Sequence, residues 1–116
     1  MKKNIYQIYY YVPKSHLEQT KSAIFAAGAG KIGNYSYCAW QTKGTGQFKP
    51  EPKSNAYIGK IGKVSKVIEY KVETICSAKN LKLIIKALKN SHPYEQPAFG
   101  AIKIYPGLIP RAKSEN

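Results

Sequence analysis

The residues Val67-Ile-Glu-Tyr-Lys-Val-Glu-Thr74 and, after a short gap, Leu81-Lys-Leu-Ile-Ile-Lys-Ala-Leu88 decide the fold. Between 68 and 73 apolar and charged side chains alternate one by one, which is the pattern of a strand with one buried face. From 81 to 88 apolar residues recur at i, i+3, i+4 and i+7, which is the stripe of an amphipathic helix. These two segments therefore predict a strand that is followed within a few residues by a helix.

Two further elements are predicted before this centre. Ile5 to Val12 is rich in β-branched and aromatic residues and is ended by Pro13, so we expect a strand. A helix follows from about Leu17 to Ala27. A capping box at 15–18 marks its start, and the glycines at 28 and 30 mark its end.

The remaining strands complete the order of elements. Tyr35 to Gln41 is predicted as the second strand. Residues 43–64 hold six of the glycines and prolines and show no periodicity, so we expect a long loop there. The third strand, which contains the first quoted segment, runs from Val64 to Cys76, and the last covers about Ala98 to Tyr105.

This order, β-α-β-β-α-β, is the split βαβ of ferredoxin-like α+β domains. Right-handed crossovers place both helices on one face of a four-stranded antiparallel sheet. We expect one domain over residues 1–110 and a frayed tail over 111–116. The other sheet face is expected to carry Tyr9, Tyr11, Tyr35 and Tyr37, and such an apolar face predicts a homo-oligomer.

Composition limits the classes of function. The chain has 116 residues and a net charge of +13, but among its basic residues only Arg111 is arginine and the lysines are scattered along the whole length. Because specific nucleic-acid recognition favours the guanidinium group, we do not expect a nucleic-acid partner. No run approaches the ~18 apolar residues of a membrane span. With Cys38 and Cys76 read as reduced core thiols and no signal-peptide pattern, we expect a cytoplasmic protein without a membrane partner.

Two motifs carry functional groups. Gly28 to Gly33 matches the dinucleotide fingerprint G-x-G-x-x-G, but a helix precedes it and a strand follows, which is the reverse of what pyrophosphate binding needs. These glycines are better explained as left-handed caps of the first helix. The cluster His92-Pro-Tyr-Glu95 could ligate a metal, transfer a proton or hold a polar ligand. It is equally explained by a histidine at a helix C-terminus and a glutamate paired with a lysine.

Five segments together resemble one family: Gly28 to Tyr35, Cys38 to Trp40, Gly44 to Phe48, Ile58-Gly59 and His92 to Ala98. They are similar, in order and in position along the fold, to the PII/CutA-like domain inserted in the Nif-three-like proteins. That dinuclear-metal-binding family is also labelled GTP cyclohydrolase type 2-like. Small proteins made of this domain alone exist, and the chain is similar to those. The resemblance implies a PII/CutA-like fold and oligomers built through the sheet.

The resemblance also implies site residues. The family's glycine-asparagine-tyrosine and histidine-proline-tyrosine-glutamate segments correspond to Gly33–Tyr35 and His92–Glu95. The family usually continues with a second Glu, whereas this chain has Gln96, so a role that needs two adjacent carboxylates is not supported. Larger members bind two metals through residues outside this domain. This chain has two His and no Asp, so the hydrolase activity of the family name is not transferred to it.

We therefore expect an oligomeric module that binds a small ligand or a divalent metal ion and has no catalytic residue. We expect both helix-to-strand connections at the same end of the sheet, where they would form one cleft from Gly33, Asn34, Tyr35, Gly46, Phe48, His92, Tyr94 and Glu95. For a metal ion, His92 and Glu95 are the candidate ligands. Two alternatives stay open: a basic nucleic-acid-binding domain, and a small enzyme with His92 and Glu95 as acid and base.

Overall fold

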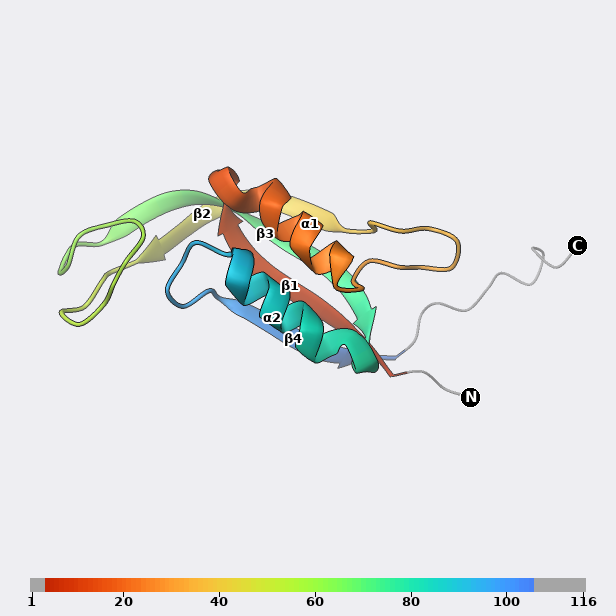
Figure 1. Ribbon diagram of the computed structural model, residues 1–116. Helices are drawn as coiled ribbons and strands as arrows, with labels where there is room; N and C mark the ends of the chain where they lie inside the picture. The colour runs from red at the N-terminus through yellow and green to blue at the C-terminus, as the bar shows by residue number, and fades with distance from the viewer. Residues whose placement is uncertain (1–3, 106–116) are drawn as a thin grey trace, which may run out of the picture.

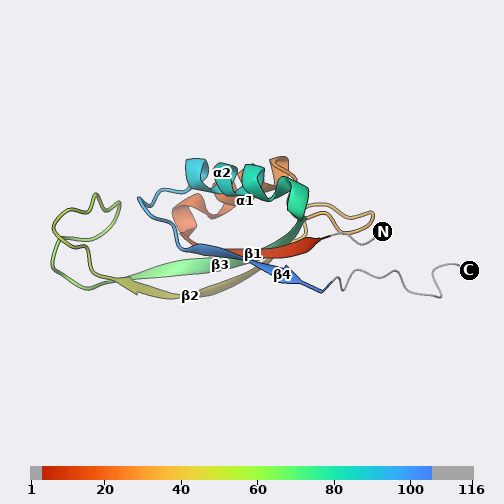
Figure 2. The same cartoon turned by 90° about the horizontal axis from the view of Figure 1, so that it is seen from below.

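A four-stranded antiparallel sheet carries two helices on one of its faces (Figures 1 and 2). The computed structural model describes residues 4–105. The elements, in chain order, are β1 (Ile5–Pro13), the 3-10 turn η1 (Lys14–His16), α1 (Leu17–Ala26), β2 (Trp40–Phe48), β3 (Ser65–Ser77), the 3-10 turn η2 (Ala78–Asn80), α2 (Leu81–Ser91) and β4 (Phe99–Ile104). The predicted β-α-β-β-α-β order and α+β class are confirmed. The predicted domain end at 110 and the tail 111–116 lie outside the described residues.

The sheet order is β2-β3-β1-β4, so β3 and β1 lie in the centre. Ile5 of β1 pairs with Ser77 of β3 on one side and with Ile104 of β4 on the other. At the opposite end of β1, Pro13 pairs with Glu69. These registers define two ends of the sheet, which we call the Ile5 end and the Pro13 end.

The core lies between the helices and the face of the sheet that they cover. Every second residue of β1 and β3 points into it, as the alternation predicts. The buried apolar residues are Ile8, Tyr10, Val12, Leu17, Ile24, Ala29, Val72, Cys76, Ile84 and Leu88. Tyr10 donates a hydrogen bond to Thr20 Oγ1 (2.9 Å), and burial raises the pKa of Tyr10 to about 12. The phenol therefore stays neutral, and the deepest polar atom of the core has its partner.

The position of β2 corrects the sequence prediction. The predicted strand at Tyr35–Gln41 overlaps β2 only at Trp40 and Gln41, and the predicted loop at 43–64 includes most of the strand. β2 is an edge strand, and most of its side chains are exposed. Because neither face is buried, the sequence lacks the apolar alternation that marks β1 and β3.

The start of α1 also differs from the prediction. No side chain caps the helix, whose N-cap residue is His16. The 3-10 turn η1 precedes the helix, so Ser15 lies one residue before the cap position, and its Oγ is 2.9 Å from His16 Nδ1 instead. Glu18 pairs with Lys21 Nζ at 3.0 Å. The predicted capping box is therefore wrong.

The connection from α1 to β2 depends on glycine. Gly28, Gly30 and Gly33 have φ values of 116°, 82° and 55°, which confirms that glycines in the left-handed region end the helix. Tyr35 is 74% exposed on the turn that follows. The ring of Tyr37 lies 5.2 Å from that of Phe25 in α1. Both tyrosines precede β2, so the prediction that they lie on the open sheet face is wrong.

The sheet face opposite the helices is left open by the described elements (Figure 2). Tyr9 and Tyr11 lie on this open face, as predicted, because their neighbours 8, 10 and 12 point into the core. Lys71 Nζ lies 5.2 Å from the centre of the Tyr9 ring. Trp40, at the edge of the same face, is 69% exposed. The open face is therefore aromatic as well as charged.

β2 and β3 extend beyond the rest of the sheet (Figure 1). β3 residues 65–68 pair only with β2 residues 45–48, since the register with β1 begins at Glu69. Together with the connecting residues 49–64 they form a projection that we call the hairpin arm (45–68). Among residues 4–105, no helix is long and apolar enough to cross a membrane.

Candidate functional site

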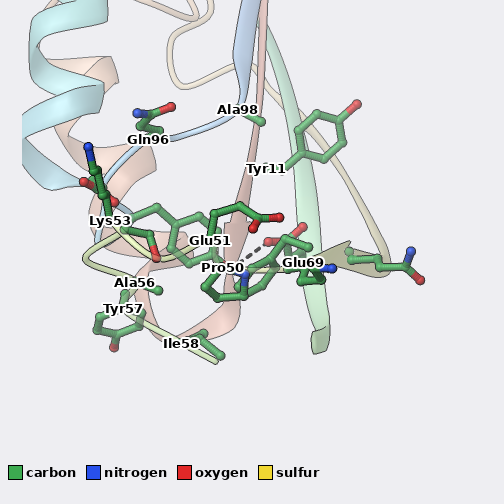
Figure 3. Close-up of a pocket in the computed structure, with 17 residues that line it drawn as sticks. Tyr11, Pro50, Glu51, Lys53, Ala56, Tyr57, Ile58, Glu69, Gln96 and Ala98 are labelled. Atoms are coloured by element: carbon green, nitrogen blue, oxygen red, sulfur yellow. Dashed lines mark hydrogen bonds between the residues drawn. The ribbon is translucent and has the colours of Figure 1, made fainter. Parts of the chain in front are cut away.

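A pocket of about 770 Å³ lies between the hairpin arm and the connection from α2 to β4 (Figure 3). The arm contributes most of the wall, and the rest comes from the Pro13 end of β1 and β3 and from residues 94–98. The lining residues are Tyr11, Gly46, Gln47, Phe48, Lys49, Pro50, Glu51, Lys53, Ser54, Ala56, Tyr57, Ile58, Glu69, Tyr94, Glu95, Gln96 and Ala98. Segments far apart in the sequence therefore form one hollow.

Backbone hydrogen bonds fold residues 49–64 of the hairpin arm, which we call the arm loop, back over the Pro13 end of the sheet. The amide of Gly62 donates to the carbonyl of Pro50 (2.7 Å), and the amide of Ser54 donates to that of Glu51 (3.0 Å). Gly59 has a φ of 96°, which permits the sharp turn between them. The amide of Asn55 donates to Glu95 Oε1 (2.9 Å), which ties the loop to the α2–β4 connection. The loop is thus closed at its base and tied to the α2–β4 connection at its middle.

Tyr94 lies at the centre of the inner wall. Its ring centre is 6.3 Å from those of Phe48 and Tyr57, so three aromatic rings form a continuous surface. The Tyr94 hydroxyl donates to Glu69 Oε2 (2.7 Å). Burial raises the pKa of Tyr94 far above its ordinary value, and the Glu69 carboxylate raises it further. The hydroxyl therefore remains a donor, and Glu69 remains oriented by it.

Gly46 makes room for this carboxylate. A Cβ built at Gly46 would collide with Oε1 of Glu69, whereas a Cβ at Gly44, two residues earlier on β2, would meet nothing within 4 Å. A side chain at this position would displace the Glu69 carboxylate from the place that it occupies here. The glycine at 46 thus belongs to the wall of the pocket.

His92 connects the sheet to the pocket wall. The pairing of β1 with β4 ends at Tyr10 and Phe99. The carbonyl of the next residue of β1, Tyr11, accepts a hydrogen bond from His92 Nε2 (2.6 Å). Because Nε2 is the donor, Nδ1 carries the lone pair that accepts the amide of Tyr94 (3.1 Å). Burial lowers the pKa of His92, although the Tyr11 carbonyl acts in the opposite direction. The ring is 7% exposed and neutral, and both of its nitrogens are occupied.

Comparison with known proteins places this fold in a wider group. No protein-family profile matches the chain. The GTP cyclohydrolase 1 type 2 homolog of Halalkalibacterium halodurans is 46% identical over 96 residues, which are 83% of this chain and 26% of that protein. The crystal structure of a Bacillus cereus protein related to NIF3 matches with a TM-score of 0.76 and 34% identity over 88% of this chain and 26% of that one.

This chain has a PII/CutA-like fold and resembles part of the NIF3-related proteins. It spans about a quarter of the length of the curated relatives that it matches. The periplasmic divalent cation tolerance protein CutA from Archaeoglobus fulgidus has a TM-score of 0.65 and 19% identity, over 90% of this chain and 87% of that one. At that identity the likeness shows the shared fold.

The PII/CutA-like domain brings together half of the predicted site residues in the pocket. Gly46, Phe48, Tyr94 and Glu95 line it directly. His92 lies behind the wall, with its ring centre 4.8 Å from that of Tyr94. Whether these residues bind a ligand stays a prediction.

Gly33, Asn34 and Tyr35 lie elsewhere within the chain. Gly30, just before them, donates its amide to the carbonyl of Ile75, at the Ile5 end of the sheet. Residues 92–98 lie at the Pro13 end, and Figure 1 shows the two connections at opposite ends of the sheet. The expectation that both lie at the same end is wrong. Each crossover returns the chain to the end where its first strand began, and β1 and β3 run in opposite directions.

The predicted metal ligands do not converge in the PII/CutA-like domain. Among residues 4–105, no three His, Cys, Asp or Glu side chains gather in a way that could hold a metal ion. Both His92 nitrogens are used, so this ring has no lone pair for a metal. Glu95 uses one oxygen to accept the amide of Asn55. His92 therefore has no free nitrogen in this structure, and whether His92 or Glu95 binds a metal stays a prediction.

Several pocket residues could not be found from the sequence. Glu69 was assigned only to the polar side of a strand, and Glu51, Ser54 and Tyr57 lie in a segment without periodicity. The one usable signal was the aromatic and glycine content of the loop, which predicted a functional segment but no partners. The pocket depends on contacts between residues that are far apart in the sequence, such as Asn55 with Glu95, which are 40 positions apart.

Proposed function

We propose that this PII/CutA-like domain is a binding module that holds a small ligand in the pocket between the hairpin arm and residues 94–98. The pocket itself is the observation that carries the proposal. Its volume of about 770 Å³ is within the range of small-molecule sites. Its wall combines an aromatic surface with fixed polar groups, and this combination gives such sites both affinity and orientation.

Binding is favoured over catalysis by the state of His92. A general base needs a free nitrogen within reach of a substrate, and both nitrogens of this ring are engaged with the backbone. Glu95 is fixed to the arm loop, so His92 and Glu95 do not form an acid-base pair here. Nucleic-acid binding is not proposed, because the positive charge is scattered lysine.

We also propose that the module is a homo-oligomer that uses the open face of the sheet. Tyr9, Tyr11 and the exposed Trp40 lie on or beside it, and Ile102 of β4 is 50% exposed. An apolar surface of this kind is usually covered by another protein surface. Sedimentation velocity at micromolar concentration tests this, and a stable 13.0 kDa monomer would refute it. Two free thiols, Cys38 and Cys76, support a cytosolic location.

The ligand site is tested by two measurements. Native mass spectrometry of untagged protein reports any ligand that is retained, together with the number of subunits. NMR titration with a fragment set of mixed charge then shows whether the amides of 46–58 and 94–98 respond together. If no fragment shifts these amides at millimolar concentration, the proposed function fails.

A pair of tyrosine variants localises the binding. Tyr57→Ala removes an exposed ring from the pocket wall, and Tyr35→Ala removes an exposed ring from the remote turn. Both are surface changes, so both variants should fold. Tyr57→Ala should weaken fragment binding about tenfold, and Tyr35→Ala should leave it unchanged. A loss in Tyr35→Ala instead would indicate a site completed by the Gly33–Tyr35 turn of a neighbouring subunit.

A further inference from the structure

The glutamates of this chain are distributed unevenly. The chain has six Glu against 19 Lys and Arg, yet Glu51, Glu69 and Glu95 all line the same pocket. The other two described glutamates have ion pairs: Glu18 with Lys21 at 3.0 Å, and Glu73 with Lys71 at 3.8 Å. Within residues 4–105, none of the three pocket glutamates has a Lys, Arg or His nitrogen within 4.0 Å. In a strongly basic protein, the carboxylates without a cation are those of the pocket.

The orientation of these side chains is shown in Figure 3. The carboxylate of Glu51 points toward Glu69, whereas the ammonium group of Lys53 points away from both. Glu69 is half-buried and fixed by Tyr94, and one oxygen of Glu95 accepts the amide of Asn55. Each ionised carboxylate has about four lone-pair sites. Most of their capacity to accept hydrogen bonds is therefore left for a bound molecule.

The pocket wall also contains a hydroxyl group without a hydrogen-bond partner. The hydroxyl oxygen of Ser54 is buried, and it is the one buried side-chain oxygen or nitrogen of residues 4–105 that makes no hydrogen bond. Ser54 lines the same pocket. Buried polar atoms are nearly always paired, so Ser54 adds an unsatisfied hydroxyl to the wall, and this oxygen has to turn toward the hollow before it can contact a ligand.

The aromatic wall, like the carboxylates, favours a positively charged ligand. The faces of Phe48, Tyr57 and Tyr94 carry negative electrostatic potential and attract cations. A metal ion is not the best fit, because it requires oxygens that converge to within ~2.0–2.6 Å of one point. The described carboxylates do not gather in this way. They are distributed around a hollow that is much larger than one ion.

We propose that the pocket binds a small organic cation, in which an ammonium or guanidinium group is joined to an apolar or aromatic body. This rests on the proposed binding function and adds the class of ligand. The cationic group lies between Glu51 and Glu69 and donates to both, and the body packs on the aromatic wall. An anionic molecule of the same shape is disfavoured by the three carboxylates, none of which has an ion pair, although Lys49 and Lys53 also line the pocket.

Three probes of similar shape and different charge test the proposal: benzylamine, benzyl alcohol and benzoate. Their binding is followed at pH 7 by NMR titration of the amides of 46–58 and 94–98. Benzylamine, which is protonated at this pH, should bind at least about tenfold more tightly than benzyl alcohol, and benzoate should bind most weakly. Raising the salt concentration should reduce this preference, because the interaction is between charges.

Isosteric variants identify the groups responsible. Glu69→Gln and Glu51→Gln should each weaken benzylamine binding by about three- to tenfold and leave benzyl alcohol unchanged. Glu18→Gln, on the exposed side of α1, is the matched control and should change neither. Glu51 is exposed, so its variant remains informative even if Glu69→Gln folds poorly.

The outcomes separate this proposal from the proposed function. If benzyl alcohol or benzoate binds these amides as tightly as benzylamine, the ligand class is refuted and the pocket remains a binding site. The same holds if fragments of the mixed set bind but the two pocket variants keep full affinity for benzylamine. If no fragment or probe of any charge shifts the pocket amides, both proposals fail.

Discussion

Replacing His92 with Ala should destabilise the fold strongly, even though the residue lies outside every apolar stripe of the sequence. The ring joins the Pro13 end of β1 to the pocket wall through one hydrogen bond at each nitrogen. The sequence alone predicts an intact fold for His92→Ala, because His92 belongs to no apolar stripe. In the structure the residue is 7% exposed, so its removal affects the interior.

The magnitude follows from what the change leaves behind. The Tyr11 carbonyl and the Tyr94 amide both lose their partner, and an unsatisfied buried polar group costs ~1–3 kcal/mol. The ring also packs edge-on against Tyr10 and Tyr94, at 6.4 and 4.8 Å between centres. Water that enters the gap recovers part of this loss. We expect the free energy of unfolding to fall by about 3 kcal/mol and the melting temperature to fall by about 10 °C.

Urea unfolding followed by far-UV circular dichroism at pH 7.5 measures this change, with the protein concentration held fixed. His16→Ala is the control, since His16 is the other histidine and its ring contacts Ser15 and Tyr57 at the surface. Its effect should stay below about 1 kcal/mol. A change below about 0.5 kcal/mol for His92→Ala would show that the two hydrogen bonds do not support the fold.

Three further outcomes are expected. Because burial lowers the pKa of His92, the unfolded chain takes up a proton below pH ~6.5 before the folded one does. Urea curves at pH 7.5 and 5.5 should therefore show that the free energy of unfolding decreases as the pH is lowered, by up to ~1.4 kcal/mol per pH unit. His92→Ala should lack this contribution to the pH dependence. Gly46→Ala should displace the flexible end of Glu69 and, through the lost Tyr94 hydrogen bond, reduce stability by up to about 1 kcal/mol in the same assay, whereas Gly44→Ala should be close to neutral. Tyr94→Phe removes the hydroxyl that orients Glu69 and should reduce stability by about 1 kcal/mol and weaken benzylamine binding several-fold in the NMR titration. An unchanged affinity would show that the hydroxyl does not position the carboxylate.

The elements that contribute to the core could be predicted from the sequence. β1, β3 and α2 each bury one side, so their apolar residues follow the period of the element. β2 contributes little to the core, and its glycines and polar residues resemble a loop. The predicted boundaries fail at the one strand whose position is determined by pairing with β3 instead of by burial.

The candidate site was predictable only in part, for a similar reason. The segment from His92 to Glu95 was correctly singled out as dense in functional groups. Its actual partners, Glu69 and the arm loop, are distant in the sequence and carry no local signal. The Gly33 turn lies at the other end of the sheet from His92, because β1 and β3 run in opposite directions and each crossover returns to the end where its strand began.

The hairpin arm has a consequence for how occupancy of the pocket is transmitted. Its strand residues pair only with each other, so the arm can open locally without breaking contacts in the core, and its amides should exchange with solvent sooner than those of β1. A ligand held between the arm and residues 94–98 opposes that opening by RT ln(1 + [L]/Kd), which is about 2.7 kcal/mol at 100 times the Kd. A ligand of the proposed kind would thereby convert its own concentration into the degree of order of a projecting segment, while the helices and the central strands keep their structure.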